Sequence, residues 1–292
     1  MTFLYFCHCI GPMKVVESVV YITKIHTATR YLLDKDDDEF EYYDDSRGIY
    51  THMQIIPGNK LSPEQSLILD IIISLWNSGR RLFTVTDILA TTHGQDTRKI
   101  GTITAQQAEE INDIIEELRN IDVIINGDSR PLIDVAKKKR QPVKYKYHTT
   151  GDLIQWHISD NEPILLTSAF TYSYPCRWLN IYPSRGLTSA AVVKYVIDRI
   201  VIGSVQKGHY KKRSSSNRIR LSTIMSKSGY LPDSSRSRWR CMMTKTEQIL
   251  TACVDSDEIP LKSYDVAYNG TSGRLDCTVF ILHYGKGYDS NG

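Results

Sequence analysis

Three arginines at alternate positions, Arg236, Arg238 and Arg240, stand near the start of a segment with helical spacing. A planar guanidinium donates paired hydrogen bonds to phosphate oxygens or to the O6 and N7 acceptors of guanine. The first turns of a helix are where a major-groove reader contacts base edges. Because an α-helix has about 3.6 residues per turn, Arg236 and Arg240 share a face and Arg238 points elsewhere. We expect the shared face to meet base edges and Arg238 to meet a phosphate.

Further cations precede these arginines along the chain. From Arg185 to Lys245 the sequence holds fourteen Lys and Arg residues and two acids, Asp198 and Asp233. The segment 209–218 mixes cations with serines and an asparagine, and both kinds of donor suit phosphate oxygens. A flexible, solvated loop is the alternative for this segment. The candidate DNA contacts in this part of the chain are Arg236, Arg238, Arg240, Lys245, Lys211, Lys212, Arg213, Arg218 and Arg220.

The rest of the chain balances this positive charge. The 292 residues carry a net charge of only +3, because residues 34–45 are strongly acidic while the last third is basic. Charge that is segregated in this way often accompanies a nucleic-acid surface, and simple solvation is the alternative. A hydrophobic content of 41% is enough for one large or two small cored domains.

No motif for enzyme chemistry stands out. The sequence lacks a GxSxG nucleophile elbow, a GxxxxGK[ST] phosphate loop and the HxH pair with an apolar middle residue that holds the metal of rolling-circle nickases. Eight dispersed histidines and six cysteines without a CxxC pair predict no metal site, and Cys7-His8-Cys9 has no second pair nearby. We therefore expect no catalytic residue, no metal and no cofactor. Cys241 and Cys253 are expected to be semi-buried thiols of a reducing cytosol.

Membrane and export signals are also missing from the sequence. No run reaches the roughly 18 apolar residues of a membrane span. Residues 1–12 are apolar but lack a basic leading segment and a small-residue cleavage site. Met13-Lys14 favours a start later than Met1. A cytoplasmic protein with no membrane partner is the expectation.

A set of three helices begins after the breaker Pro57-Gly58-Asn59. Ser62 is placed to cap the first helix, and Pro63 suits its first position. Apolar residues in 67–76 recur at about 3.6-residue spacing, as on one buried helix face. The elements predicted around this helix are strands at 40–43 and 49–56, helices at 84–93 and 104–120, a strand at 121–125, a basic loop at 137–140 and a strand at 143–147.

A similar order returns in the last third of the chain. Segment 152–183 is predicted to be mostly strand and to dock the two halves together. Beyond it, Thr188 is placed to cap a helix. The predicted elements are helix 189–202, basic loop 207–220, helices 221–228 and 234–253, and strands 259–268 and 275–283 around a turn with two glycines.

The two sets differ in the charge of the third helix. In the first set this helix carries five acids and Arg119 alone, so a phosphate backbone would repel it. We expect the first set to contribute cations from its wing and to serve otherwise as a dimer surface. The candidate wing contacts are Lys137, Lys138, Lys139 and Arg140.

Three helices followed by a hairpin, twice over, predict an α+β protein with a tandem duplicated winged helix, meaning a helix-turn-helix plus a β-hairpin wing. The expected division is an N-terminal extension with the acidic segment at 1–60, a first winged helix at 61–150, a β-rich connection at 151–184, a second, basic winged helix at 185–284 and a disordered tail at 285–292.

The sequence resembles plasmid and mobile-element replication initiators built from two tandem winged helices. The resemblance lies in the apolar spacing of Leu61–Ala90, Asp113–Asn126, Leu187–Val201 and Asn217–Ser228. It implies a C-terminal winged helix that binds origin repeats in double-stranded DNA and an N-terminal one that supports dimerisation. Recruitment of host helicase machinery is a further implied role.

Initiation of replication is the function that we expect. A transcriptional regulator binding an operator is the alternative on the same fold, because both functions need only affinity for DNA. A DNA-processing enzyme such as a nickase or integrase is an alternative of another class. An interaction or structural protein that uses the acidic N-terminal segment is a third.

Overall fold

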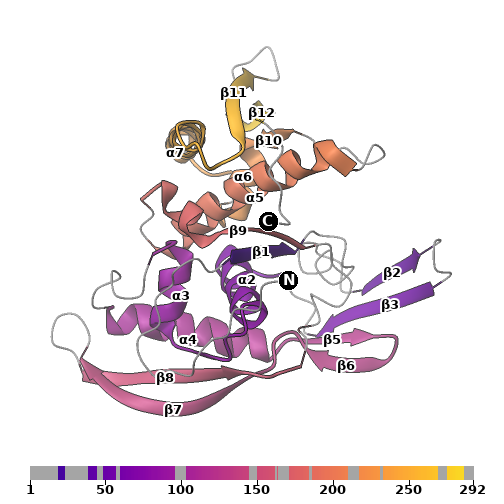
Figure 1. The fold of residues 1–292 in the computed structure, drawn as a ribbon, viewed down its shortest axis with the longest axis vertical. Coiled ribbons are helices and arrows are strands. Elements are labelled where there is room, and N and C mark those ends of the chain that lie inside the picture. The colour runs from indigo at the N-terminus through magenta and orange to yellow at the C-terminus, as the bar shows by residue number, and fades with distance from the viewer. Residues whose placement is uncertain are drawn as a thin grey trace.

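The computed structural model describes residues 19–23, 39–44, 49–56, 60–95, 103–144, 150–161, 163, 171–183, 186–209, 217–230, 233–268 and 275–285. These residues form a mixed α+β fold with small antiparallel sheets. Along the long axis of the molecule, helices α2 to α4 lie in a lower half and α5 to α7 in an upper half (Figure 1).

Three capped helices make up the lower half, and their predicted positions are confirmed. They are α2 (Pro63–Asn77), α3 (Val85–Thr92) and α4 (Ala105–Arg119). Ser62 and Thr104 each accept a hydrogen bond from the backbone N–H three residues on, and each cap's own N–H donates to the side-chain oxygen of the glutamine at that position. These reciprocal bonds satisfy amide groups that an open helix end leaves unpaired.

A three-stranded sheet covers these helices. Its strands are β4 (Leu82–Phe83), β7 (Val135–Lys144) and β8 (Thr150–Ile158), in the order β4-β8-β7. The predicted basic loop at 137–140 is therefore wrong, because these residues belong to β7 and pair with β8. A solvated edge strand tolerates a run of lysines, which also blocks pairing with other chains.

A second sheet in the lower half has the order β2-β3-β5-β6. Strands β2 (Glu39–Asp44) and β3 (Ile49–Ile56) confirm the two predicted strands of the N-terminal segment. Strand β3 pairs with β5 (Asp122–Ile125), which continues into β6 (Asp128–Pro131). Asn126 and Gly127 have φ angles of 51° and 91°, and this hairpin turn needs positive φ at both positions.

The upper half is built on α5 (Leu187–His209), α6 (Leu221–Lys227) and α7 (Arg236–Val254). The predicted bounds of α6 and α7 are correct to within two residues. Helix α5 begins before Thr188 and continues past 202 to His209, so neither the predicted cap nor the start of the predicted basic loop is correct. The Thr188 hydroxyl instead donates to Glu64 Oε1 of α2 at 2.6 Å, and this tertiary contact replaces capping.

The sheet of the upper half is formed by β10 (Arg218–Arg220), β11 (Leu261–Tyr268) and β12 (Thr278–Tyr284), in the order β10-β12-β11. A short helix, η4 (Leu275–Cys277), precedes β12. In both halves, a strand that follows the first helix pairs with the last strand of the half. The lower half adds the β5–β6 hairpin to this common order.

Several elements join the halves. Strand β1 (Val19–Thr23) pairs with β9 (Thr171–Pro175), and the short helix η3 (Cys176–Ile181) follows. The prediction that segment 152–183 is mostly strand is therefore correct for β8 and β9 and wrong at η3. Gly94, at the end of α3, has φ +60° and lies so close to η3 that an added Cβ would be 2.4 Å from the Cys176 carbonyl oxygen. On the other side of η3, Trp178 Nε1 donates to Glu258 Oε2 of the upper half at 3.1 Å. The short helix η3 therefore lies between the two halves and contacts both of them.

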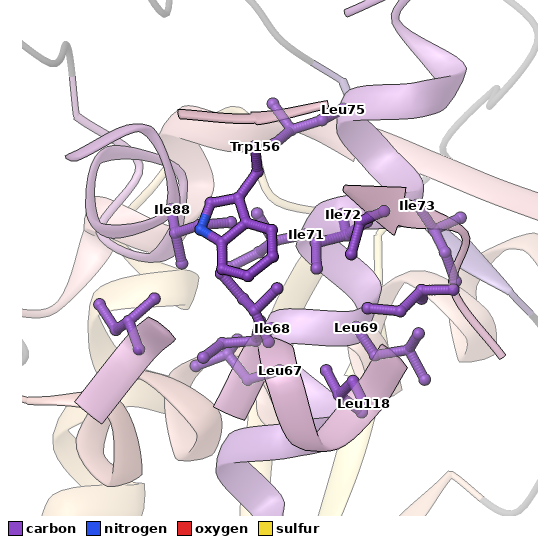
Figure 2. Close-up of a cluster of buried hydrophobic side chains, with 14 of the residues drawn as sticks. Leu67, Ile68, Leu69, Ile71, Ile72, Ile73, Leu75, Ile88, Leu118 and Trp156 are labelled. Atoms are coloured by element: carbon purple, nitrogen blue, oxygen red, sulfur yellow. The ribbon is translucent and has the colours of Figure 1, made fainter. Parts of the chain in front are cut away.

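Two hydrophobic cores lie on either side of this junction. In the lower core, Trp156 of β8 is fully buried among Ile68, Ile71 and Ile88 (Figure 2). Its Nε1 donates to Asn112 Oδ1 of α4 at 2.9 Å, which satisfies the one polar atom of the ring. Residues at the start of α5 also belong to this core, so the two halves share apolar packing.

A buried ionic cluster lies where α2 meets α5. Lys194 Nζ is 2.8 Å from Asp70 Oδ2 of α2 and 2.7 Å from Asp198 Oδ2 of α5. Tyr174 of β9 donates its hydroxyl to Asp198 Oδ1 at 2.9 Å. Burial tends to lower the pKa of Lys194, but the two carboxylates outweigh it and the pKa is raised. Burial raises the pKa of Asp198 despite the lysine, and burial and that carboxylate raise the pKa of Tyr174.

Within the described ranges, the structure contains no helix with the length and apolar character needed to cross a membrane.

Candidate nucleic-acid interface

The first turns of α7 form the strongest candidate site. The side chains of Arg236, Arg238 and Arg240 are all exposed, and the first turn of the helix contains no acid. Ser235 caps the helix, and its hydroxyl oxygen accepts from the Arg238 amide at 3.4 Å. The partial positive charge of a helix N-terminus adds to that of the guanidinium groups. This end of α7 therefore carries an exposed arginine surface, which consists of these three residues.

The opposite face of α7 explains why the arginines point outward. Trp239, Met242 and Ile249 are 7%, 5% and 0% exposed and pack into the upper core. Trp239 is therefore a core residue of the upper half. With one face fixed by apolar packing, residues 236 and 240 are directed to solvent by the helical period.

The C-terminal end of α6 has a well-defined cap. Gly229 has φ +73°, its amide donates to the Ser226 carbonyl, and the Tyr230 amide donates to the Met225 carbonyl, both at 3.0 Å. This pair of bonds is a Schellman motif, in which glycine takes the left-handed position without steric cost. The Tyr230 ring centroid lies 5.7 Å from the guanidinium carbon of Arg238. The sequence pattern did not single out Tyr230 as part of the candidate site. The signal that could have indicated it is the pair Gly229-Tyr230 directly after a short helix.

Strand β10 adds two of the predicted cations. Arg218 and Arg220 are exposed, whereas Ile219 between them is 1% exposed and faces the core. Arg199 of α5 donates from Nη2 to the Arg218 carbonyl at 3.2 Å, which supports the strand from behind. Lys211, Lys212 and Arg213 lie outside the described residues.

Lys245 occupies a different environment from the arginines. Its side chain is half-buried, and Nζ donates to Ser189 Oγ of α5 at 2.6 Å. Burial lowers the pKa of Lys245, with an opposing contribution from Cys241. The structure therefore ties this ammonium group to α5 and does not bring it into the arginine surface.

The four predicted wing cations of the lower half divide into two groups. Lys137 forms an ion pair with Glu116 of α4 and lies 5.4 Å from the Trp156 ring centroid. Lys138, Lys139 and Arg140 are exposed on β7. Lys137 is opposite Trp156 and Lys139 is opposite Gln155, so the strand bulges by one residue between them. This bulge turns Lys139 to the other face of the sheet.

Helix α4 carries the opposite charge to α7. Its exposed acids are Glu109, Glu110, Asp113 and Glu117, and Gln65 of α2 donates to Glu117 Oε2 at 2.8 Å. The third helices of the two halves thus present surfaces of opposite sign. Of these two helices, α7 is the one whose first turns are cationic.

The hairpin of the upper half braces α7 from its C-terminal side. The Tyr264 hydroxyl of β11 lies 3.0 Å from Thr251 Oγ1 and 3.3 Å from the Glu247 carbonyl oxygen. On the exposed side of the hairpin, His283 Nε2 is 2.7 Å from Asp265 Oδ2. These contacts fix the hairpin relative to the helix that bears the arginines.

The cysteines do not behave alike. Cys253 is buried in the upper core, and burial raises its pKa to about 12. Cys241 is exposed on α7, so the expectation of a semi-buried thiol is wrong at this position. Among the described residues, no group of three or more His, Cys, Asp and Glu side chains is arranged to hold a metal ion.

Comparison of the chain with protein-family models and with curated protein sequences found no match.

Proposed function

We propose that this protein binds double-stranded DNA through its upper half, with the start of α7 in the major groove. The observation that carries the proposal is the arginine surface on a capped helix without an acid in its first turn. The order α5-β10-α6-α7-β11-β12 of the upper half supports a winged helix, in which α6 and α7 would be the helix-turn-helix and β11–β12 the wing. Arg218 and Arg220 add positive charge for phosphate contacts.

The lower half is a second winged helix in this proposal, with α3 and α4 in the helix-turn-helix positions and β7–β8 as the wing. Its acidic third helix does not enter a groove, because the phosphates would repel it. Lys138, Lys139 and Arg140 touch the DNA backbone from the wing. The remaining surface serves a homodimer.

Initiation of replication of a plasmid or mobile element, with host helicase machinery as a partner, is the role that we assign to this DNA binding. A regulator of transcription is the second candidate on the same geometry. Footprinting on the DNA flanking the gene separates them, because repeated protected boxes support an initiator and one promoter-centred palindrome supports a regulator. If the protein were a nickase or an integrase, it would instead cleave the bound duplex or transfer a strand of it.

The DNA proposal is tested by fluorescence anisotropy with a duplex selected from a random library. Arg236→Ala or Arg240→Ala is expected to weaken binding to the selected duplex by about 1–3 kcal/mol and to relax selectivity at one base position. Arg130→Ala is the matched control, because Arg130 is an exposed arginine on β6 of the lower half. Equal losses for the α7 variants on selected and random duplexes would refute base reading. Failure of the unaltered chain to bind any duplex would refute the function.

A further inference from the structure

The three arginines of α7 are not equivalent. Arg238 has the Tyr230 ring 5.7 Å from its guanidinium carbon, a contact within the range of a cation–π interaction. Tyr230 itself is half-buried, packs against the upper core and is held by the Schellman bonds of the α6–α7 turn. The aromatic ring is thus anchored by core packing and by the backbone bonds at the end of α6, whereas the Arg238 side chain is exposed.

A guanidinium against an aromatic face keeps its hydrogen-bonding capacity. Its N–H donors lie in the plane of the group, so the ring occupies one face and leaves the donors at the edge. The ring also restricts the rotamers of a long side chain, which lowers the entropy lost when a ligand binds. The Arg238 side chain is drawn back toward the turn between the helices, at the flank of the exposed helix start. A backbone phosphate is the group that this flank meets when α7 lies in a groove.

We propose that Tyr230 is a positioning residue that holds Arg238 ready for a DNA backbone phosphate, while Arg236 and Arg240 are left to the bases. This inference rests on the proposed function. It assigns Tyr230 to the DNA-binding site and gives the arginines different roles. A positioning residue acts only through the group that it holds, and this makes its effect separable from that of a charge.

The test is a double-mutant cycle in DNA affinity, made with Tyr230→Leu, Arg238→Ala and the double variant. Tyr230→Leu is expected to weaken binding about 3-fold, equally on selected and random duplexes, because an Arg238 side chain without the ring beside it loses more rotamer freedom when it binds a phosphate. In the Arg238→Ala background the same change is expected to have no further effect. In the Arg236→Ala background, the control cycle, it should again cost about 3-fold. Equal effects of Tyr230→Leu in all three backgrounds would overturn the proposal.

The salt dependence of binding gives a second readout. Arg238→Ala should lower the slope of log K against log salt by about 0.9, the value for one phosphate contact. Tyr230→Leu should leave the slope unchanged, because the charge remains. Tyr230→Phe keeps the ring and should bind like the unaltered chain. A Tyr230→Phe variant as weak as Tyr230→Leu would show that the hydroxyl, and not the ring, matters.

A readout without DNA keeps this inference distinct from the proposed function. In NMR spectra of arginine-labelled protein, the ring of Tyr230 should shift the side-chain signals of Arg238, and Tyr230→Leu should remove that shift while Tyr230→Phe retains it. Unchanged Arg238 signals in Tyr230→Leu would refute the positioning even if the protein binds DNA. A ring-dependent shift in a chain that binds no duplex would refute the phosphate role and the function together.

Discussion

Replacing Lys194 by methionine tests the junction between the two halves most directly. The Lys194 side chain is 6% exposed, and its ammonium lies within 2.8 Å of carboxylate oxygens of both Asp70 and Asp198. Methionine fills a similar volume but carries no charge. The substitution therefore leaves two buried carboxylates, each at most 17% exposed, next to each other without a cation.

The size of the effect follows from that geometry. Removing one partner of a buried ion pair costs about 3–5 kcal/mol, because the remaining charge is left desolvated and unpaired. At roughly 2–4 °C per kcal/mol for a chain of this size, the midpoint of thermal unfolding should fall by about 10 °C. Asp70→Asn is the matched comparison. It leaves Lys194 paired one to one with Asp198, so its cost should be only about 1–2 kcal/mol.

Urea unfolding followed by circular dichroism measures both variants. Hydrogen exchange in α2 and α5 should also rise in Lys194→Met, because the cluster joins these helices. A loss in Lys194→Met that is no larger than in Asp70→Asn would refute the reasoning. It would mean that water reaches the cluster and screens its charges.

Two further predictions concern the same junction. Gly94→Ala should destabilise the protein by about 2–4 kcal/mol in thermal unfolding, because positive φ is strained and the new Cβ would meet the backbone of η3. Gly79→Ala is the control and should cost only about 1 kcal/mol, because Gly79 also has positive φ but nothing lies within 4 Å of its Cβ position. Equal losses of stability in the two variants would contradict the close packing of Gly94 against η3. Burial, only partly opposed by Lys194, raises the pKa of Asp198 in the folded protein. The stability that the protonated Asp198 carboxyl contributes is therefore full below the unfolded pKa of about 3.9 and is lost as the pH rises through the folded pKa. The free energy of unfolding of Asp198→Asn should therefore improve relative to the unaltered chain from about pH 4 upward, and a constant difference would refute the shift.

Local signals in the sequence predicted most of the helices. Ser62 with Gln65, and Thr104 with Gln107, cap helices through bonds that span three residues, so the pattern is complete within one turn. The outward arginines of α7 were predictable for the same reason, because the apolar period of one helix fixes which face is left to solvent. Trp239 fits the same pattern and is buried.

Signals that depend on distant partners misled the sequence analysis. The sequence around Thr188 predicts a helix cap, but in the structure its hydroxyl donates to Glu64, which is 124 positions away in the chain. The sequence pattern predicts Lys137 to be a loop cation, whereas in the structure it belongs to a strand and contacts Glu116 and Trp156. In each case the competing interaction comes from a segment that sequence spacing does not relate to it.

The sequence by itself determined most of the helices and the caps at Ser62 and Thr104, because these depend on neighbours within a few positions. It also determined the segregation of basic and acidic charge along the chain. Tertiary structure alone decided that Lys194 joins Asp70 and Asp198 in the interior, that Lys245 turns to Ser189 and that Tyr230 lies against Arg238. The physical reason is that burial and pairing of charged groups depend on which elements pack together. That choice is made by the whole core and not by any one segment.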